Sequence, residues 1–198
     1  MSDIEIPSEA KDRSQKAVGL TIAVLAVLLA VVSSLGNSED NEKIVNEVKA
    51  SNHYAWYQAK RIREAMNDIA VEQLRAGLLA GNATSAQQSK VEAMAQRYQA
   101  KNLEYKAENA EIQQKAHGFM NQAALSARKG DRFDLAEVFL QVAVVLCSVT
   151  LLTNQRGFFR SGLLVAAVGV AVGITAFTIT EPPEVPSKGA HVAPIHSA

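Results

Sequence analysis

Long apolar runs alternate with long polar stretches along this chain of 198 residues. Three apolar runs contain no Lys or Arg except at their borders: Ala17–Leu35, Leu135–Thr153 and Ser161–Thr180. The hydrocarbon core of a bilayer is about 30 Å thick, and a helix needs roughly 20 apolar residues to cross it. The pattern therefore predicts three transmembrane helices, which we assign to residues 17–35, 132–154 and 160–180.

The polar middle of the chain, residues 36–131, is rich in helix-forming residues. It contains no proline, and Gly81–Thr84 interrupts it. This predicts two long helices joined by a turn at about residues 81–84. Thr84 and Ser85 each have a Gln three residues later, which is the spacing of a capping box. Gly36–Asn37 and Gly130 are positions where either helix could break.

Both runs carry a repeat of alternating three- and four-residue spacings, typical of a narrow coiled-coil seam. On the first helix we assign the seam to Val48, Asn52, Ala55, Ala59, Ile62, Met66, Ile69 and Gln73. On the second we assign it to Val91, Ala95, Tyr98, Asn102, Tyr105, Asn109, Ile112, Ala116, Phe119 and Ala123. The expected fold is an all-α integral membrane protein with a long antiparallel two-helix coiled-coil hairpin inserted between spans 1 and 2.

The two ends of the chain are polar. Residues 1–16 carry charges of both signs, and residues 181–198 contain four prolines together with His191 and His196. A Pro-rich segment of this kind cannot form a packed core, so we expect a disordered tail. We interpret its two histidines as incidental and expect no metal site there.

Charge and cysteine content exclude several classes of protein. Residues 36–131 hold 13 Lys and Arg against 12 Asp and Glu, so no basic face predicts nucleic-acid binding. Cys147 is the single cysteine, which excludes an intrachain disulfide. No phosphate loop, nucleophile elbow or dinucleotide fingerprint is present. We therefore expect a protein that is not an enzyme and has no cofactor.

A polar face within the second span is one candidate site. Glu137, Gln141 and Ser148 recur at helical spacing, and an ionisable residue inside a membrane indicates function unless it is paired or solvated. One interpretation is a proton or cation path formed by several copies. The other is that Asp134 and Glu137 cap the start of this helix, favoured by its dipole.

A second candidate is the aromatic and basic cluster around Trp56, Tyr57, Lys60 and Arg61, which could be a docking surface or an anion site. Trp56 lies about 30 Å beyond the membrane end on a straight helix, too far for an interfacial belt. We therefore expect it to pack on the return helix near residues 108–111.

Small residues recur within the spans, notably Gly19 and Ala23 in the first and Gly169 and Gly173 in the third. Such spacings let helices approach closely in lipid. Packing among the chain's own spans and association between copies explain them equally well.

Orientation follows from Lys and Arg in short segments, because long domains translocate largely regardless of charge. Lys11, Arg13, Lys16, Arg156 and Arg160 lie on one side of three spans, against Lys188 on the other. This predicts a cytoplasmic N-terminus and an exposed domain outside the cytoplasm. Lys115, Arg128, Lys129 and Arg132, next to the second span, favour the opposite orientation.

Three segments carry a resemblance to a known family: Glu5–Glu9, Ala50–Glu64 around the WYQAK sequence at Trp56–Lys60, and Phe139–Thr153. The chain resembles a bacterial inner-membrane family described only as a domain of unknown function, with three spans and a coiled-coil middle. The resemblance implies a bacterial inner membrane and no mechanism. In such a membrane, the orientation predicted from the Lys and Arg residues places the exposed domain in the periplasm.

These patterns favour a non-enzymatic, oligomeric inner-membrane protein that presents its helical hairpin as a scaffold or interaction surface. Its expected partners are the lipid bilayer and either further copies or a larger membrane protein. A homo-oligomeric ion channel or transport component, and an accessory subunit of a larger membrane complex, are the alternatives.

Overall fold

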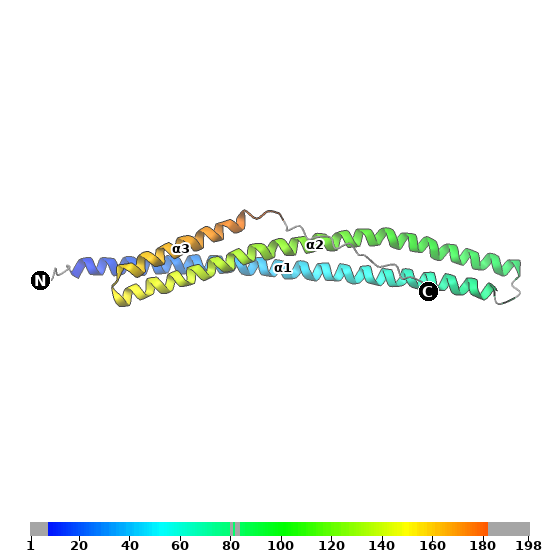
Figure 1. The fold of residues 1–198 in the computed structure, drawn as a ribbon, viewed down its shortest axis with the longest axis horizontal. Coiled ribbons are helices and arrows are strands. Elements are labelled where there is room, and N and C mark those ends of the chain that lie inside the picture. Colours follow the sequence, from blue (N-terminus) through cyan, green and yellow to red (C-terminus); the bar gives the residue numbers. More distant parts are fainter. Residues whose placement is uncertain (1–7, 80, 82–83, 182–198) are drawn as a thin grey trace, which may run out of the picture. The chain divides into compact units, whose positions relative to one another are not determined.

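All the regular secondary structure in the described part of the chain is helical, as predicted. The computed structural model describes residues 8–79, 81 and 84–181, with only the backbone described for residues 8–14. It contains α1 (Ser8–Leu79), α2 (Ser85–Thr153) and α3 (Arg156–Phe177), as Figure 1 shows. The tail predicted to be disordered, with His191 and His196, lies outside the described residues from residue 182 onward.

Two helices are longer than any single predicted element. With 72 residues, α1 runs from the first apolar run into the polar middle, and α2, with 69 residues, joins the polar middle to the second apolar run. Neither Gly36–Asn37 nor Gly130 breaks its helix. A Cβ at Gly36 would lie 3.3 Å from Asp134 Oδ1, and one at Gly130 would lie 3.2 Å from Asp40 Oδ1. Both glycines therefore allow neighbouring side chains to approach within continuous helices.

The chain divides into two compact units. Unit 1 comprises Met1–Lys43 and Ala123–Ala198, and unit 2 comprises Ile44–Gln122. All three helices carry a stretch long and apolar enough to cross a membrane, judged by length and composition.

Unit 1 has a small apolar core in which α2 is central. Leu25 of α1, Leu140, Ala143 and Cys147 of α2, and Ala166 of α3 form its buried centre. The link between α2 and α3 is only Asn154 and Gln155, and Asn154 has a φ of 52°. Asn tolerates this left-handed conformation better than most residues, so it suits an abrupt reversal.

In unit 2, α1 and α2 lie side by side in opposite directions (Figure 1). Ion pairs and hydrogen bonds join Lys60 with Glu108, Asn67 with Asn102, and Arg75 with Glu92, so residue numbers fall on α2 as they rise on α1. The start of α2 has the predicted capping box. The Thr84 N–H donates to Gln87 Oε1 at 2.9 Å, and the Gln87 N–H donates to Thr84 Oγ1 at 3.4 Å.

The seam prediction is confirmed on α2 and wrong on α1. All the α2 seam residues that fall in unit 2, from Val91 to Phe119, are buried or half-buried. On α1 the buried and half-buried positions form a different stripe, which we call the inner stripe: Asn46, Ala50, His53, Tyr57, Lys60, Glu64, Asn67 and Val71. The residues we had assigned to the seam are exposed. With Val45 they form what we call the outer stripe: Val45, Val48, Asn52, Ala55, Ala59, Ile62, Met66, Ile69 and Gln73.

The error has a simple physical origin. Both stripes have alternating spacings of three and four residues, and at 100° per residue they lie about 150° apart around α1. The prediction chose the more apolar of the two. In the structure α2 contacts the more polar one, because its seam offers amide and aromatic partners and Glu92 and Glu108 beside the seam offer carboxylates.

Candidate functional site

A buried polar layer joins the inner stripe to α2 in unit 2. The Asn102 amide donates to Asp68 Oδ1 at 2.7 Å and to the Glu64 carbonyl oxygen at 3.2 Å, and Asn102 Oδ1 accepts from Asn67 at 2.8 Å. The Glu64 carboxylate lies 3.0 Å from the Arg61 guanidinium and 3.5 Å from Lys106 Nζ. A buried polar layer with matched partners fixes the register of two helices, since any slip would leave polar groups unpaired.

The prediction included Asn102 but missed Glu64. Glu64 does fit a repeat, since it lies seven residues after Tyr57 and seven before Val71, but the outer stripe has the same spacing and is more apolar. From the sequence alone, the Glu64 carboxylate is interpreted as an ordinary surface charge, because it is not known that the inner stripe faces another helix.

Aromatic contacts continue the same interface toward the end of unit 2. The His53 ring stacks on the Phe119 ring with centroids 5.5 Å apart, and the Tyr54 ring meets the His117 ring edge-on at 6.1 Å. Lys49 Nζ lies 5.4 Å from the Phe119 centroid. These aromatic partners of the two histidines could not be predicted, because the register between the helices is not known from the sequence.

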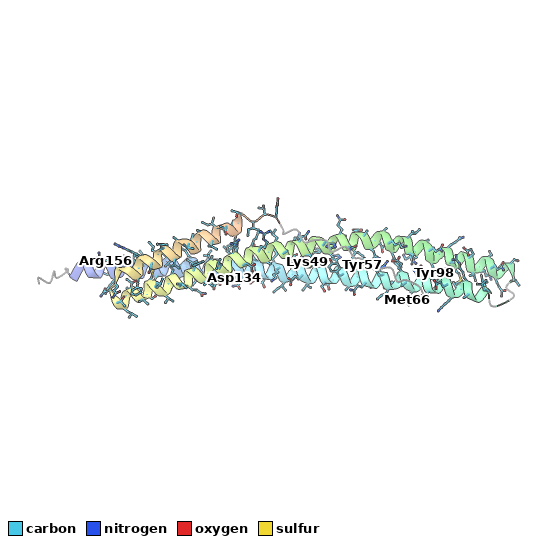
Figure 2. All side chains as sticks on the ribbon, in the orientation of Figure 1. Lys49, Tyr57, Met66, Tyr98, Asp134 and Arg156 are labelled. Carbon is cyan, nitrogen blue, oxygen red and sulfur yellow. The ribbon has the colours of Figure 1, made fainter. Side chains whose placement is uncertain are left out.

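The four residues of the predicted interaction surface do not share one face. Tyr57 and Lys60 belong to the inner stripe, and Lys60 pairs with Glu108. Arg61 is exposed and pairs with Glu64. Trp56 is 65% exposed, and its ring is paired edge-on at 6.2 Å with the His53 ring of its own helix, so the expected packing of Trp56 on the return helix is wrong. Figure 2 labels Tyr57, which belongs to the inner stripe, and Met66, which belongs to the outer stripe.

The polar face of the second span lies outside the buried face of α2. That buried face consists of Phe133, Ala136, Leu140, Ala143, Cys147 and Thr150. The Gln141 amide donates to Glu137 Oε1 at 3.0 Å, and the Ser148 hydroxyl donates to the Val144 carbonyl oxygen at 2.8 Å. The interpretation of Asp134 and Glu137 as N-terminal capping residues is wrong, because α2 begins at Ser85 and the dipole acts only within the first turn.

Small residues of α3 pack directly on α2 within unit 1. The buried residues of α3 are Gly162, Ala166, Gly169, Gly173 and Ala176. A Cβ at Gly162 would lie 2.8 Å from Cys147 Sγ, and one at Gly169 would lie 2.9 Å from Phe139 Cβ. Gly19 and Ala23 of α1 are exposed, and a Cβ at Gly19 would have no neighbour within 4 Å.

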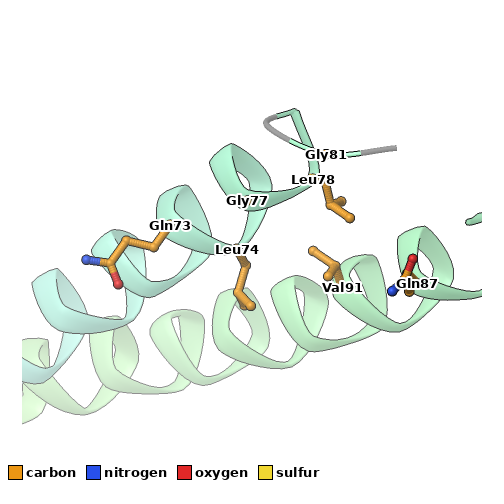
Figure 3. Close-up of a pocket in the computed structure, with 7 residues that line it drawn as sticks. All are labelled: Gln73, Leu74, Gly77, Leu78, Gly81, Gln87 and Val91. Carbon is orange, nitrogen blue, oxygen red and sulfur yellow. The ribbon is translucent and has the colours of Figure 1, made fainter. Parts of the chain in front are cut away.

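A pocket of unit 2 lies where α1 ends and α2 begins (Figure 3). Its lining residues are Gln73, Leu74, Gly77, Leu78, Gly81, Gln87 and Val91. None of them titrates, so the pocket offers shape and two amide groups but no acid, base or nucleophile. Among the described residues, no three His, Cys, Asp or Glu side chains are grouped to hold a metal ion.

Comparison with known proteins gives one assignment. Searches of curated proteins and of solved structures found no match. The family described as Domain of unknown function (DUF4337) matches residues 14–179, which include the described part of all three helices from residue 14 onward. The chain therefore belongs to the DUF4337 family.

Proposed function

We propose that the chain is a non-enzymatic protein of a bacterial inner membrane that crosses the bilayer three times and associates with further copies. In this proposal residues 36–131 form a coiled-coil hairpin that acts as a scaffold or interaction surface. The N-terminus is cytoplasmic and the hairpin is periplasmic.

The observation that carries the proposal is how little of the apolar surface is buried. In the most apolar 18-residue stretch of each helix, only 6% (α1), 28% (α2) and 22% (α3) is buried inside the molecule. Burying apolar surface away from water is worth roughly 25 cal/mol per Å², so these faces need a non-aqueous surrounding. Lipid provides it, and close contacts at Gly162 and Gly169 supply helix packing that does not depend on water.

Native mass spectrometry of protein extracted gently from its own membrane tests the proposal. We expect the chain to resist carbonate extraction and to give a defined homo-oligomer. For orientation, single cysteines at Glu111 and at Arg156 in a Cys147→Ala background should react differently with an impermeant maleimide, and Glu111→Cys should be labelled from the periplasm. Release by carbonate would contradict the membrane assignment, and labelling of Arg156→Cys instead would reverse the orientation.

A homo-oligomeric channel or transport component is the second candidate, supported by the Glu137–Gln141 hydrogen bond on a face outside the core of unit 1. In reconstituted bilayers this candidate requires a current that Glu137→Gln alters. A current that is absent, or unchanged in Glu137→Gln, would remove it.

An accessory role in a larger membrane complex is the third candidate, supported by the outward position of Trp56. In this case the same mass spectra would contain a different, larger protein in fixed ratio. Its loss on Trp56→Ala, with the hairpin still folded, would identify the contact.

A further inference from the structure

The outer stripe leaves α1 with an apolar face that no described residue of unit 2 covers. Ile62 is 61% exposed and Met66 is 62% exposed, and Val45, Val48 and Ile69 are at least half exposed. The side chains of α2 contact the opposite side of α1, at the inner stripe. In unit 2, α2 therefore covers the more polar side of α1, and the more apolar side of α1 is exposed.

The spacing of the outer stripe indicates the shape of its partner. Positions four and three residues apart continue from Val45 to Gln73, which is four heptads and about 42 Å of helix. A stripe that keeps a 3.5-residue repeat over this length stays in line only with another helix lying nearly parallel to it.

Among the described residues of unit 2, only those of α1 offer a matching surface. The exposed large apolar residues of α2 there are Met94, Leu103 and Met120, which follow no helical repeat. A second α1 carries the same stripe, and a two-fold axis brings identical surfaces together. The partner that fits the outer stripe is therefore the outer stripe of another copy.

Orientation follows from the proposed function, on which this step rests. Copies inserted with the same topology present their α1 helices in parallel. A parallel, in-register pair places Asn52 opposite Asn52 at one of the inward positions, where a buried Asn pair specifies a parallel dimer and its register.

The flanking charges agree with the parallel arrangement. Lys49 and Arg63 flank the stripe on one side, and in a parallel pair they face Ile44 and Gln58 of the other copy. An antiparallel pair that overlaps over Val45–Ile69 would instead bring Lys49 of each copy next to Arg63 of the other. Two such contacts between like charges disfavour that arrangement.

Trp56 is also accounted for by the pairing. It flanks the stripe beside Ala55 and Ala59, whose small side chains leave space between two backbones. The exposed indole would lie over this space and face Ser51 of the other copy. Large aromatic side chains at such places contribute strongly to association.

We propose that two copies of the chain pair through the outer stripe of α1, forming a parallel, in-register, two-stranded coiled coil. With Ala55, Ala59 and Asn52 at inward positions, the pairing is weaker than that of an all-Leu seam. Confinement of both copies to one membrane raises their effective concentration and offsets this weakness.

Cysteine cross-linking of the full chain in its own membrane tests the proposal. In a Cys147→Ala background, Ile62→Cys and Met66→Cys place thiols on the stripe, and Leu103→Cys places one at the equally exposed position on α2 (68%). With a short bis-maleimide we expect cross-linked dimer at both stripe positions and only background at Leu103. Equal yields at all three positions would overturn the proposal.

The direction is tested with two differently tagged copies, one carrying Val48→Cys and the other Met66→Cys. These positions are about 27 Å apart in a parallel pair and adjacent in an antiparallel one. We expect no cross-link between the two tags, and a strong one would overturn the parallel arrangement.

A charge on the stripe gives an independent readout, because Trp56 is the only tryptophan. We expect Ile62→Glu to abolish the cross-link at Met66→Cys and to shift Trp56 emission to the red, while Leu103→Glu changes neither. If Ile62→Glu changes neither quantity, the stripe is not the interface. If native mass spectra of this variant still show a homo-oligomer, the proposed function stands and the copies must associate through another surface. If carbonate instead releases the chain from the membrane, the proposed function itself is rejected.

Discussion

The two units of this chain use the same helical repeat with opposite chemistry. In unit 1, α3 contacts α2 through Gly162, Ala166 and Gly169, and added Cβ atoms at the two glycines would meet Cys147 and Phe139 within 3 Å. In unit 2, α1 contacts α2 through ion pairs, amides and aromatic rings. Spacing alone therefore does not reveal what holds two helices together.

The difference agrees with the surroundings proposed for each unit. Apolar burial between helices gains nothing in lipid, so close approach of small residues replaces it. In water, buried polar groups without partners cost about 1–3 kcal/mol each, so a paired polar layer selects one register.

The largest effect is expected for Gly169→Leu in unit 1. A side chain there meets Phe139 Cβ and the Ala136 carbonyl oxygen, 2.9 and 3.2 Å from its Cβ, so α3 must shift. Overpacking of this kind costs about 1–3 kcal/mol or more. Because Cys147 is fully buried beside α3, we expect a membrane-permeant maleimide to label it faster in the variant.

Gly157→Leu is the matched control for this variant. Gly157 is also in α3, but a Cβ there has no neighbour within 4 Å, so labelling of Cys147 should be unchanged. Equal labelling in the two variants would show that close approach at Gly169 does not hold α3 in place.

The next effect in size is expected for Asn102→Ala in unit 2, where the loss is at most about 3 kcal/mol. This change removes three hydrogen bonds and leaves Asp68 and the Glu64 carbonyl oxygen without their amide donor. We expect destabilisation by about 1–3 kcal/mol, measured as faster amide hydrogen exchange of residues 60–70. Leu103→Ala changes the next, exposed residue and should cost less than about 0.5 kcal/mol. A larger effect at Leu103 would contradict the importance of the polar layer.

The Lys60–Glu108 ion pair should contribute less, because both side chains are partly exposed. In a double-mutant cycle with Lys60→Met and Glu108→Gln, we expect a coupling energy of about 0–1 kcal/mol that falls as salt is added. Labelling of Cys147 should not depend on salt in the same way. A coupling energy insensitive to salt would mean that this pair is buried more deeply than its exposure indicates.

The smallest effect concerns pH. A hydrogen bond from Lys115, 2.6 Å away, lowers the pKa of the Glu111 carboxyl below its ordinary value of 4.5. The pair therefore contributes its stability above pH 4.5 and loses it as the pH falls through the lowered pKa. Because the carboxyl is fully exposed, the visible effect is in its titration and not in unfolding.

An NMR titration of the Glu111 carboxyl measures this directly. Lys115→Met should raise its pKa toward 4.5. Lys101→Met, ten residues and about 15 Å away along the helix, should leave it unchanged because salt screens that distance. An unchanged pKa in Lys115→Met would contradict the assignment of Lys115 as the cause.

Local signals in the sequence were sufficient for several features. The all-helical class, the Thr84–Gln87 capping box and the α2 seam each depend on residues a few positions apart, so the chain alone could predict them. The membrane spans and the orientation also come from local composition, and they stay predictions.

Other features depended on contacts between distant residues. Whether Ile62 or Glu64 faces α2 is decided by Asn102 and Lys106 on α2. The spacing of residues along α1 does not reveal the register between the two helices, so this could not be predicted. Similarly, Gly36 and Gly130 are expected to break a helix when only their neighbours in the sequence are considered. Only their approach to Asp134 and Asp40 explains why the helices continue.

The two-residue link between α2 and α3 has a consequence for the order of events during biosynthesis. The face of α2 that receives α3 is uncovered only while the ribosome adds Asn154, Gln155 and the 22 residues of α3. At 5–20 residues per second this interval is about one to five seconds. The glycines of α3 are then the next helical surface of the same chain to arrive, so the short link limits the time for which this face of α2 is open to helices of other chains.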